Sequence, residues 1–330
     1  QMSAAAFRRD IEDPDTVTQF ARLVGTESRL KLLLLFTFAD VAGVGPDVMT
    51  PWKEERLWQL YVAAYNYLTL SYSDDVIDDG NLIRDDLDRQ RPSDISHDEL
   101  TSFLEGYPQR YIRVVDRPRV YEHVRLSRNL RPSEVHTTLT ENDAAWELSA
   151  ITIDEPGLFA SICGVLSYFG MNILRGQAMT NEHGVVLDIF QFSDHEGYLK
   201  MNDAAKSEMI DTLENVISGK QDIEKKLQGR QRAQITFPRP ERVKPVIRFN
   251  DHYSQRFTVL EIVADNAWGL LYRISQTISS EQCDIELVLI STEGAKAIDV
   301  FHLTKAGGKL ANPAQHALAE ALEATFKHPN

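Results

Sequence analysis

The stretch Ile151-Thr152-Ile153-Asp154-Glu155-Pro156-Gly157-Leu158-Phe159 decides the fold of this chain. An alternating run typical of a strand ends in Asp-x-Pro-Gly, and an amphipathic run follows at once. Because proline fixes φ and glycine permits a tight backbone path, the spacing predicts a strand-to-helix turn. The first amides of a helix lack intrahelical partners and favour negative charge, so this turn predicts a site for a carboxylate, unless Asp154 itself caps the helix.

The same pattern occurs a second time along the chain. The matching landmarks are Gly157-Leu158 with Gly269-Leu270, Asn172-Ile173 with Asp284-Ile285, and Asp188-Ile189-Phe190 with Asp299-Val300-Phe301. Because several landmarks keep their spacing, they indicate a duplicated module and not a chance turn. We name Trp146 to Asp194 the first copy and Phe257 to Lys305 the second copy.

Each copy predicts the same succession of elements. A strand leads into the glycine turn, a helix of about three turns follows, two strands form a hairpin, and another helix comes last. Hairpin turns are expected at Asn181–Gly184 and at Thr292–Gly294, where glycine stands near the turn. This order is that of a ferredoxin-like α+β unit, so the sequence predicts an α+β chain with an all-helical N-terminal domain and two such units.

Both copies resemble ACT domains, the small βαββαβ modules that bind amino acids and regulate metabolic enzymes. In the first copy the resemblance rests on Asp154-Glu155-Pro156-Gly157-Leu158 and Asn172-Ile173. It implies that Asp154 and Asn172 meet the amino and amide groups of a ligand, with the amides of Gly157 and Leu158 near its carboxylate. In the second copy the corresponding positions are Asn266, Trp268, Gly269, Leu270, Asp284 and Ile285. Asn266 and Trp268 depart from the pattern there, and Trp268 is expected to form an apolar wall.

Composition limits the classes of function. The chain has 330 residues, enough for roughly two or three domains, and a net charge of −14. This acidic balance argues against nucleic acid or an anionic membrane as a partner. Cys163 and Cys283 lie in separate copies without ligand spacing, so we expect no disulfide or metal framework and a reducing, cytoplasmic setting. The most apolar run, Leu32 to Ala39, is far too short to span a bilayer.

Residues 8 to about 130 predict helices. One helix is expected to begin at Thr26-Glu27 and another at Thr50-Pro51, where a cap and a first-turn proline follow in order. The apolar face of the second of these helices is expected to hold Trp52, Leu57, Leu60, Tyr61, Ala64 and Leu68.

The segment from Ser73 to Asp98 is rich in aspartate. It fits no EF-hand spacing, so we expect a solvated loop. His97-Asp98 within it invites comparison with a metal-binding pair. Ser96 followed by Glu99 is a capping box, however, and this explains the segment without a metal.

The remaining segments connect these units. Arg131–Asp143 is expected to be a polar connector, and Asp203–Leu227 a long helix with a break at Ser218-Gly219. A proline-stiffened linker is expected over Gly229–Pro245. Val246–Phe249 is expected to be the last strand of the first copy, which leaves the second copy without a fourth strand of its own. The expected domains are therefore 1–140, 144–253 and 254–330.

The order of motifs along nearly the whole chain resembles the C-terminal part of the bifunctional PII uridylyltransferase/uridylyl-removing enzymes. Ahead of the two copies the resemblance rests on Leu23–Leu30, Gly45-Pro46, Trp52-Lys53 and Phe103–Tyr111. These enzymes sense glutamine and modify the nitrogen-regulatory PII protein. The resemblance implies a regulatory, glutamine-sensing role in nitrogen metabolism. It also implies PII as a partner of the full-length enzyme, which is expected to use a divalent metal and UTP.

The catalytic motifs of that family do not occur in this sequence. Nucleotidyl transfer requires a Gly-Ser turn followed by paired carboxylates, and the chain has no Gly-Ser pair. Uridylyl removal requires an HD metal motif, which the family carries ahead of the matched segment, so His97-Asp98 is misplaced. We therefore expect no catalytic residue, metal ion or cofactor in this chain, which would be a fragment or a naturally short paralogue.

Three alternatives remain open at the level of sequence. The first is an ACT interaction module that self-associates through its sheet edges without a ligand. The second is a sensor of a different amino acid, because selectivity lies in the shape of the pocket. The third is a hydrolase that uses the acidic segment together with His97.

Overall fold

The structure, a computed structural model, divides into two compact parts. The helical part comprises Gln1–Asp86 with Pro108–Val115, and the sheet part comprises Leu87–Tyr107 with Asp116–Asn330. The residues described are 2–9, 11, 13–25, 27–45, 48–70, 77–108, 111–112, 115–142, 145–194, 197–231, 244–251, 254, 256–293 and 296–327.

The helical part contains α1 (Met2–Arg8), α2 (Pro14–Val24), α3 (Glu27–Val44) and α4 (Pro51–Leu70). The predicted helix starts at Glu27 and Pro51 are confirmed, and the Thr50 hydroxyl accepts from the Lys53 amide at 3.3 Å. Thr26 lies outside the described residues. Most of the predicted face of α4 is buried, but the side chain of Trp52 is 56% exposed, so its assignment to the core was wrong.

The acidic segment contains a helix where we expected a loop. Residues Ile77–Arg89 form α5, and of the predicted loop only residues 73–76 lie outside the described residues. Leucine and isoleucine at helical spacing account for the helix, and Leu87 at its end is buried. The density of aspartate concealed this periodicity in the sequence.

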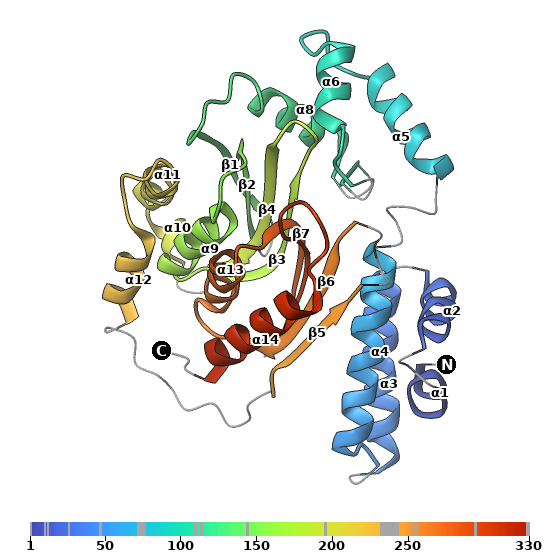
Figure 1. Cartoon of the computed structure of the whole chain (residues 1–330). Coiled ribbons are helices and arrows are strands. Elements are labelled where there is room, and N and C mark those ends of the chain that lie inside the picture. The colour runs from blue at the N-terminus through green and yellow to red at the C-terminus, as the bar shows by residue number, and fades with distance from the viewer. Residues whose placement is uncertain are drawn as a thin grey trace. The chain divides into compact units, whose positions relative to one another are not determined.

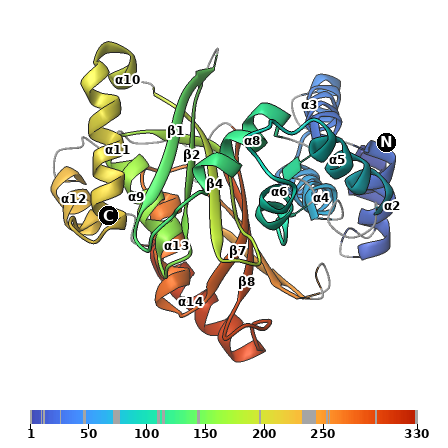
Figure 2. The ribbon, with the colours of Figure 1, turned by 90° about the horizontal axis from the view of Figure 1, so that it is seen from above.

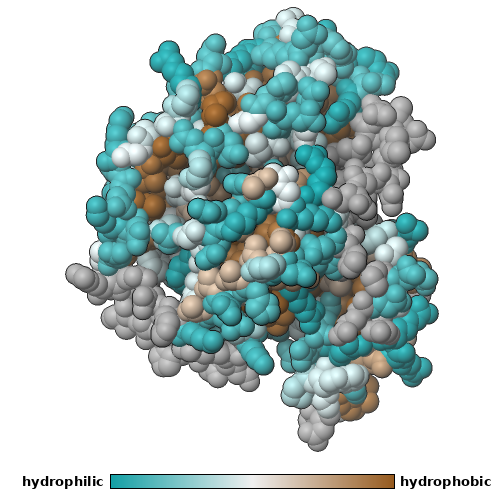
Figure 3. Space-filling view, viewed as in Figure 1, coloured by the Kyte–Doolittle hydropathy of each residue, from teal (hydrophilic) through white to brown (hydrophobic). Residues whose placement is uncertain are grey.

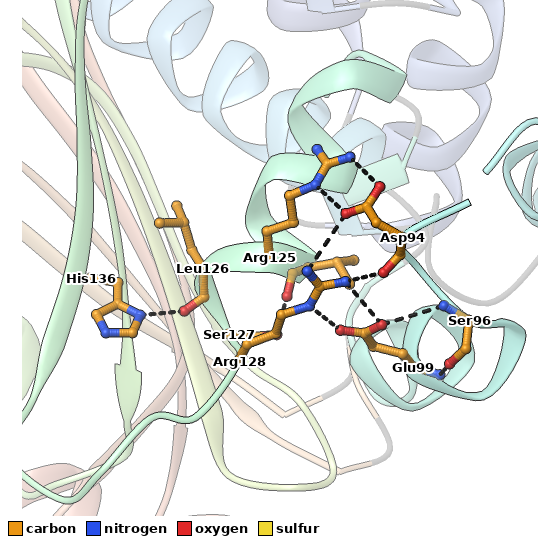
Figure 4. A network of polar contacts seen from close by, with 9 residues as sticks. Asp94, Ser96, Glu99, Arg125, Leu126, Ser127, Arg128 and His136 are labelled. Carbon is orange, nitrogen blue, oxygen red and sulfur yellow. Dashed lines mark hydrogen bonds and ion pairs between the residues drawn. The ribbon is translucent and has the colours of Figure 1, made fainter. Parts of the chain in front are cut away.

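Two short helices of the sheet part, α6 (His97–Leu104) and α8 (Arg117–Leu126), are joined by the polar network in Figure 4. The predicted capping box of Ser96 and Glu99 is confirmed. Arg128, just after α8, donates to both carboxylate oxygens of Glu99, at 2.5 and 3.2 Å. Arg125 donates to both oxygens of Asp94, and its hydrogen bond is the main reason that the pKa of Asp94 falls to about 2.

The described strands form one antiparallel, eight-stranded sheet. Its order is β1-β2-β4-β3-β7-β8-β6-β5, so the strands of the first copy lie in one half of the sheet and those of the second copy in the other half. The halves meet where β3 pairs with β7. The strands are β1 (Val135–Asn142), β2 (Ala145–Ile153), β3 (Asn172–Thr180), β4 (Val185–Ser193), β5 (Val246–Asn250), β6 (Thr258–Asp265), β7 (Asp284–Glu293) and β8 (Lys296–Thr304).

The outer strand of each half precedes the copy that it completes. Val135–Asn142, expected to lie in a connector, is β1 and pairs with β2. Val246–Asn250, expected to end the first copy, is β5 and pairs with β6 of the second copy. Both expectations were wrong, and the second copy does not lack a fourth strand. The polar composition of β1 fits an edge strand, which needs only one apolar face.

The sheet has helices on both faces (Figure 1 and Figure 2). Helices α9, α11, α13 and α14 lie over one face, and α8 lies over the other, where His123 Nε2 is 3.3 Å from Ser149 Oγ of β2. The predicted break at Gly219 is confirmed, since it separates α11 from α12 and has a φ of 71°. These helices are α9 (Leu158–Tyr168), α10 (Tyr198–Met201), α11 (Asp203–Ile217), α12 (Ile223–Gln231), α13 (Leu270–Ser280) and α14 (Asn312–Lys327).

The molecular surface is mostly hydrophilic on the face in Figure 3, with apolar residues in scattered places. None of the described helices combines the length and the apolar character needed to cross a bilayer.

Close packing of α9 depends on Gly164. A Cβ atom added there would lie 2.8 Å from Cγ1 of Ile223 in α12 and 3.0 Å from the ring of Tyr272 in α13. Helix α9 belongs to the first copy and α13 to the second, so the absence of a side chain allows the helices of the two copies to touch.

We predict that Gly164→Val lowers the free energy of unfolding by about 1–3 kcal/mol, because the added methyl groups overpack this contact. Gly229→Val is the matched control, since a Cβ atom there meets nothing within 4 Å. Urea denaturation followed by circular dichroism measures both. Equal stability of the two variants would contradict the packing argument.

Candidate functional site

The two glycine turns have the same geometry. Gly157 precedes α9 with a φ of 77°, and Gly269 precedes α13 with a φ of 67°; both are in the left-handed region that glycine tolerates. The Leu158 amide donates to the Glu155 carbonyl at 3.1 Å, and the Leu270 amide donates to Ala267 at 3.0 Å. The N-cap residue of each helix is a glycine, which has no side chain to cap the first amides. Capping by Asp154 or Asn266, the alternative to a ligand site, stays a prediction from the sequence.

Each turn faces a strand of the other copy. The turn Asp154–Leu158 lines one cavity together with Asp284–Glu286 at the start of β7, and we name this cavity A. The turn Asn266–Leu270 lines a second cavity together with Asn172-Ile173 at the start of β3, and we name this cavity B. Their volumes are about 350 Å³ and about 400 Å³.

Each cavity combines predicted residues from both copies. We expected Asp154 with Asn172 and Asn266 with Asp284, each pair within one copy. The structure instead places Asp154 with Asp284 in cavity A, and Asn266 with Asn172 in cavity B. The pairing of β3 with β7 is the reason, because it brings the start of each strand to the turn of the other copy.

Cavity A is acidic. Burial, followed by the charges of Glu286 and Asp284, raises the pKa of Asp154 above its ordinary value. Glu286 accepts a hydrogen bond from the Thr304 hydroxyl at 2.7 Å, and Glu155 accepts one from the Ser133 hydroxyl at 2.8 Å. None of the described residues that line this cavity is Lys, Arg or His.

Cavity B is neutral at its rim. Asn266 Nδ2 donates to Asn172 Oδ1 at 3.0 Å, which links the turn of the second copy to β3 of the first. Trp268, predicted to form a wall, lines the cavity, and its Nε1 donates to the Ser167 carbonyl at 2.8 Å. The Thr292 hydroxyl donates to the Ile173 carbonyl at 2.8 Å.

A buried aspartate lines each cavity. Asp188 of β4 lines cavity A and is fully buried, while Asp299 of β8 lines cavity B with 2% of its surface exposed. Both oxygens of Asp188 and Oδ1 of Asp299 have no hydrogen-bond partner among the described residues. Burial raises the pKa of Asp188 well above its ordinary value, with Asp154 contributing, and raises that of Asp299 to about 7.

We did not assign these two aspartates to the site from the sequence, although a signal was present. Both stand at the same place in the repeat, and each is followed directly by two apolar residues. An acid at a core position in both copies indicates more than a structural role, because an unpaired buried carboxyl is costly.

The other candidate residues do not assemble a metal site. His97 Nδ1 lies 2.9 Å from Asp88 Oδ1, which also accepts a hydrogen bond from Arg91 at 2.7 Å. Across the parts of the chain that the structure describes, no group of three or more His, Cys, Asp or Glu side chains is placed to hold a metal ion.

These features define an α+β protein with two composite cavities between duplicated modules. Known proteins of similar sequence are bifunctional uridylyltransferase/uridylyl-removing enzymes. The enzyme of Rhodospirillum rubrum is 29% identical over 350 residues, which covers 98% of this chain and 35% of the relative. That of Azospirillum brasilense is 30% identical over 317 residues, which covers 92% of this chain and 33% of the relative.

A third relative, from Bradyrhizobium diazoefficiens, is 28% identical over 329 residues, which covers 97% of this chain and 35% of the relative. No model of a known protein family matches the chain. The chain spans about a third of the length of these curated relatives, so the similarity is to a part of the enzyme. The resemblance to this enzyme that we stated from the sequence is confirmed.

We predict that Asp299→Asn stabilises the protein more at pH 7 than at pH 4. The pKa of Asp299 rises from 3.8 to about 7 on folding, so its contribution to stability is lost as the pH rises through about 7. Asparagine does not titrate, and the variant escapes this loss. Urea denaturation at a series of pH values gives the difference between variant and parent.

The control is Asp211→Asn on the exposed face of α11. Its difference from the parent is expected to stay constant with pH, because the Asp211 side chain is exposed and lies away from both cavities. A constant difference for Asp299→Asn as well would mean that Asp299 is not desolvated in solution.

Proposed function

We propose that this chain is the regulatory, amino-acid-sensing portion of a PII uridylyltransferase/uridylyl-removing enzyme. The two copies act as ACT domains, each completed by the strand before it, and they follow a helical region. Glutamine is the first candidate ligand, and its binding controls nitrogen signalling through PII. The catalytic centres, with their divalent metal and UTP, belong to other segments of the full-length enzyme.

The pairing of a helix start with a buried carboxylate in each cavity carries this proposal. The first amides of α9 and α13 have no intrahelical partners, and such amides bind carboxylates. Asp188 and Asp299 offer unpaired oxygens to a positive group. An α-amino acid carries both charges on groups attached to one carbon atom, so its zwitterion is complementary to each cavity.

Glutamine fits cavity B better than cavity A. Its side-chain amide offers both a donor and an acceptor, as do the amides of Asn172 and Asn266, which already bond to each other at 3.0 Å. A ligand amide inserted there keeps every polar group paired. Because the rim is neutral, it does not favour a ligand with a charged side chain.

We predict saturable binding of glutamine to the whole chain, measured by isothermal titration calorimetry. Combined Asn172→Ala and Asn266→Ala substitutions are expected to weaken it about threefold to tenfold for each hydrogen bond lost. Asn312→Ala, at an exposed position in the first turn of α14, is the matched control and is expected to leave the affinity unchanged.

Two outcomes would count against the proposal. If no amino acid binds, the sensing role fails. If an amino acid other than glutamine binds in its place, the ACT assignment survives and the link to nitrogen signalling does not.

A second candidate function is self-association. The strands at the two ends of the sheet, β1 and β5, each pair on one side only among the described strands. Unpaired strand edges join other chains readily. A mass that increases with concentration in light scattering, together with flat ligand titrations, would favour an assembly module over a sensor.

A further inference from the structure

Corresponding positions of the two cavities differ in charge. Asp154 in cavity A is matched by Asn266 in cavity B, and Asp284 is matched by Asn172. The remaining matched pairs are Glu155 with Ala267, and Glu286 with Leu174. Cavity A therefore carries an acid at each of these four positions, and cavity B carries none.

A β-bulge places Glu286 in cavity A. The register of β7 against β8 shifts between Ile285 and Leu287, so Glu286 is the extra residue. The register of β3 against β4 shifts at the corresponding place, where Leu174 is the extra residue. Bulges redirect a side chain, and the extra residue is a glutamate that lines cavity A in one copy and a leucine in the other.

The starts of the two helices, α9 and α13, also differ in charge. Arg273, one turn into α13, donates from Nη1 to the Trp268 carbonyl at 2.9 Å beside the turn of cavity B. The matching residue in α9 is Ser161, whose hydroxyl donates to the Gly157 carbonyl at 3.0 Å. Cavity B thus has a cation next to its turn, whereas cavity A has a neutral hydroxyl.

The buried carboxyl of Asp188 indicates that a ligand completes cavity A. It lines the cavity, is fully buried, and has both oxygens without a partner among the described residues. Acids that only faced solvent would need no partner, but a buried carboxyl without a hydrogen bond is costly. No described group of acids in this chain is placed to hold a metal ion, which leaves an organic cation as the class of partner.

We propose that cavity A binds a ligand with two ammonium groups, namely a basic amino acid or a diamine, and that cavity B takes the ligand with a neutral side chain. One ammonium group lies against Asp188 of β4, and the other lies between Asp284 and Glu286 of β7. This inference rests on the proposed function only in taking the cavities as ligand sites.

The two sources of such a ligand are distinguishable. A basic amino acid also has a carboxylate, for which the start of α9 provides amides without a side-chain cap from the N-cap residue. A diamine has none and gains nothing from the helix. Lysine and 1,5-diaminopentane have matched chain lengths, so their relative affinities report whether the helix start takes part.

The test is isothermal titration of the whole chain with lysine, 1,5-diaminopentane, norleucine and glutamine. Norleucine is the control ligand, because it keeps the length of lysine without the second ammonium group. Lysine is expected to bind at least about tenfold more tightly than norleucine, as expected for a hydrogen-bonded charge. Equal affinities of lysine and norleucine would overturn the proposal.

The variant Asp284→Asn with Glu286→Gln removes the second ammonium site. It is expected to weaken lysine about tenfold to a hundredfold and to leave glutamine unchanged. Asp211→Asn with Glu214→Gln on the exposed face of α11 is the control, since it makes the same change in net charge away from both cavities. An equal loss of lysine affinity in the control variant would mean that net charge alone causes the effect, and this would overturn the proposal.

The titrations distinguish a failure of this inference from a failure of the proposed function. Glutamine binding without binding of lysine or the diamine would overturn the charge assignment and leave the sensing role intact. Absence of binding for all four ligands would overturn both.

Discussion

Strand β3 lies antiparallel to β7, with Gly176 opposite Ile290 and Met179 opposite Leu287, and the rest of the sheet part depends on this pairing. It joins two similar half-sheets into one continuous sheet. Gly176 is a condition for it, because a Cβ atom there would lie 2.7 Å from the side chain of Ile290. The pairing also sets the partner of each turn, since the start of each central strand lies beside the turn of the other copy.

Two buried aspartates, Asp188 and Asp299, lower the stability of this arrangement. A carboxyl without partners in the interior favours its protonated form, which is why the pKa of Asp299 rises to about 7. The protein without a ligand therefore carries an unfavourable free energy, which binding of a positive group would reduce. Strained or unsatisfied groups of this kind are expected at functional sites and not in ordinary cores.

The sequence predicted what is local and repeated. The turn at Pro156-Gly157, the helix after it, the hairpin at Asn181–Gly184 and the break at Gly219 all follow from short-range chemistry. It predicted neither the copies that β1 and β5 join nor the pairing of β3 with β7, because pairing between strands far apart in the chain leaves no local signal. For the same reason the sequence identified the turns and strand starts that line the cavities, but it paired each turn with the strand of its own copy. In the structure each turn faces the strand of the other copy.

The exchange of turns and strands has a consequence for how such a repeat diverges. Duplication usually frees one copy to change while the other keeps the old role. Here each cavity draws its turn from one copy and its strand from the other, so a substitution in either copy alters only half of one cavity. A new specificity needs matched changes in both halves of the gene, and neither copy inherits a complete pocket by itself.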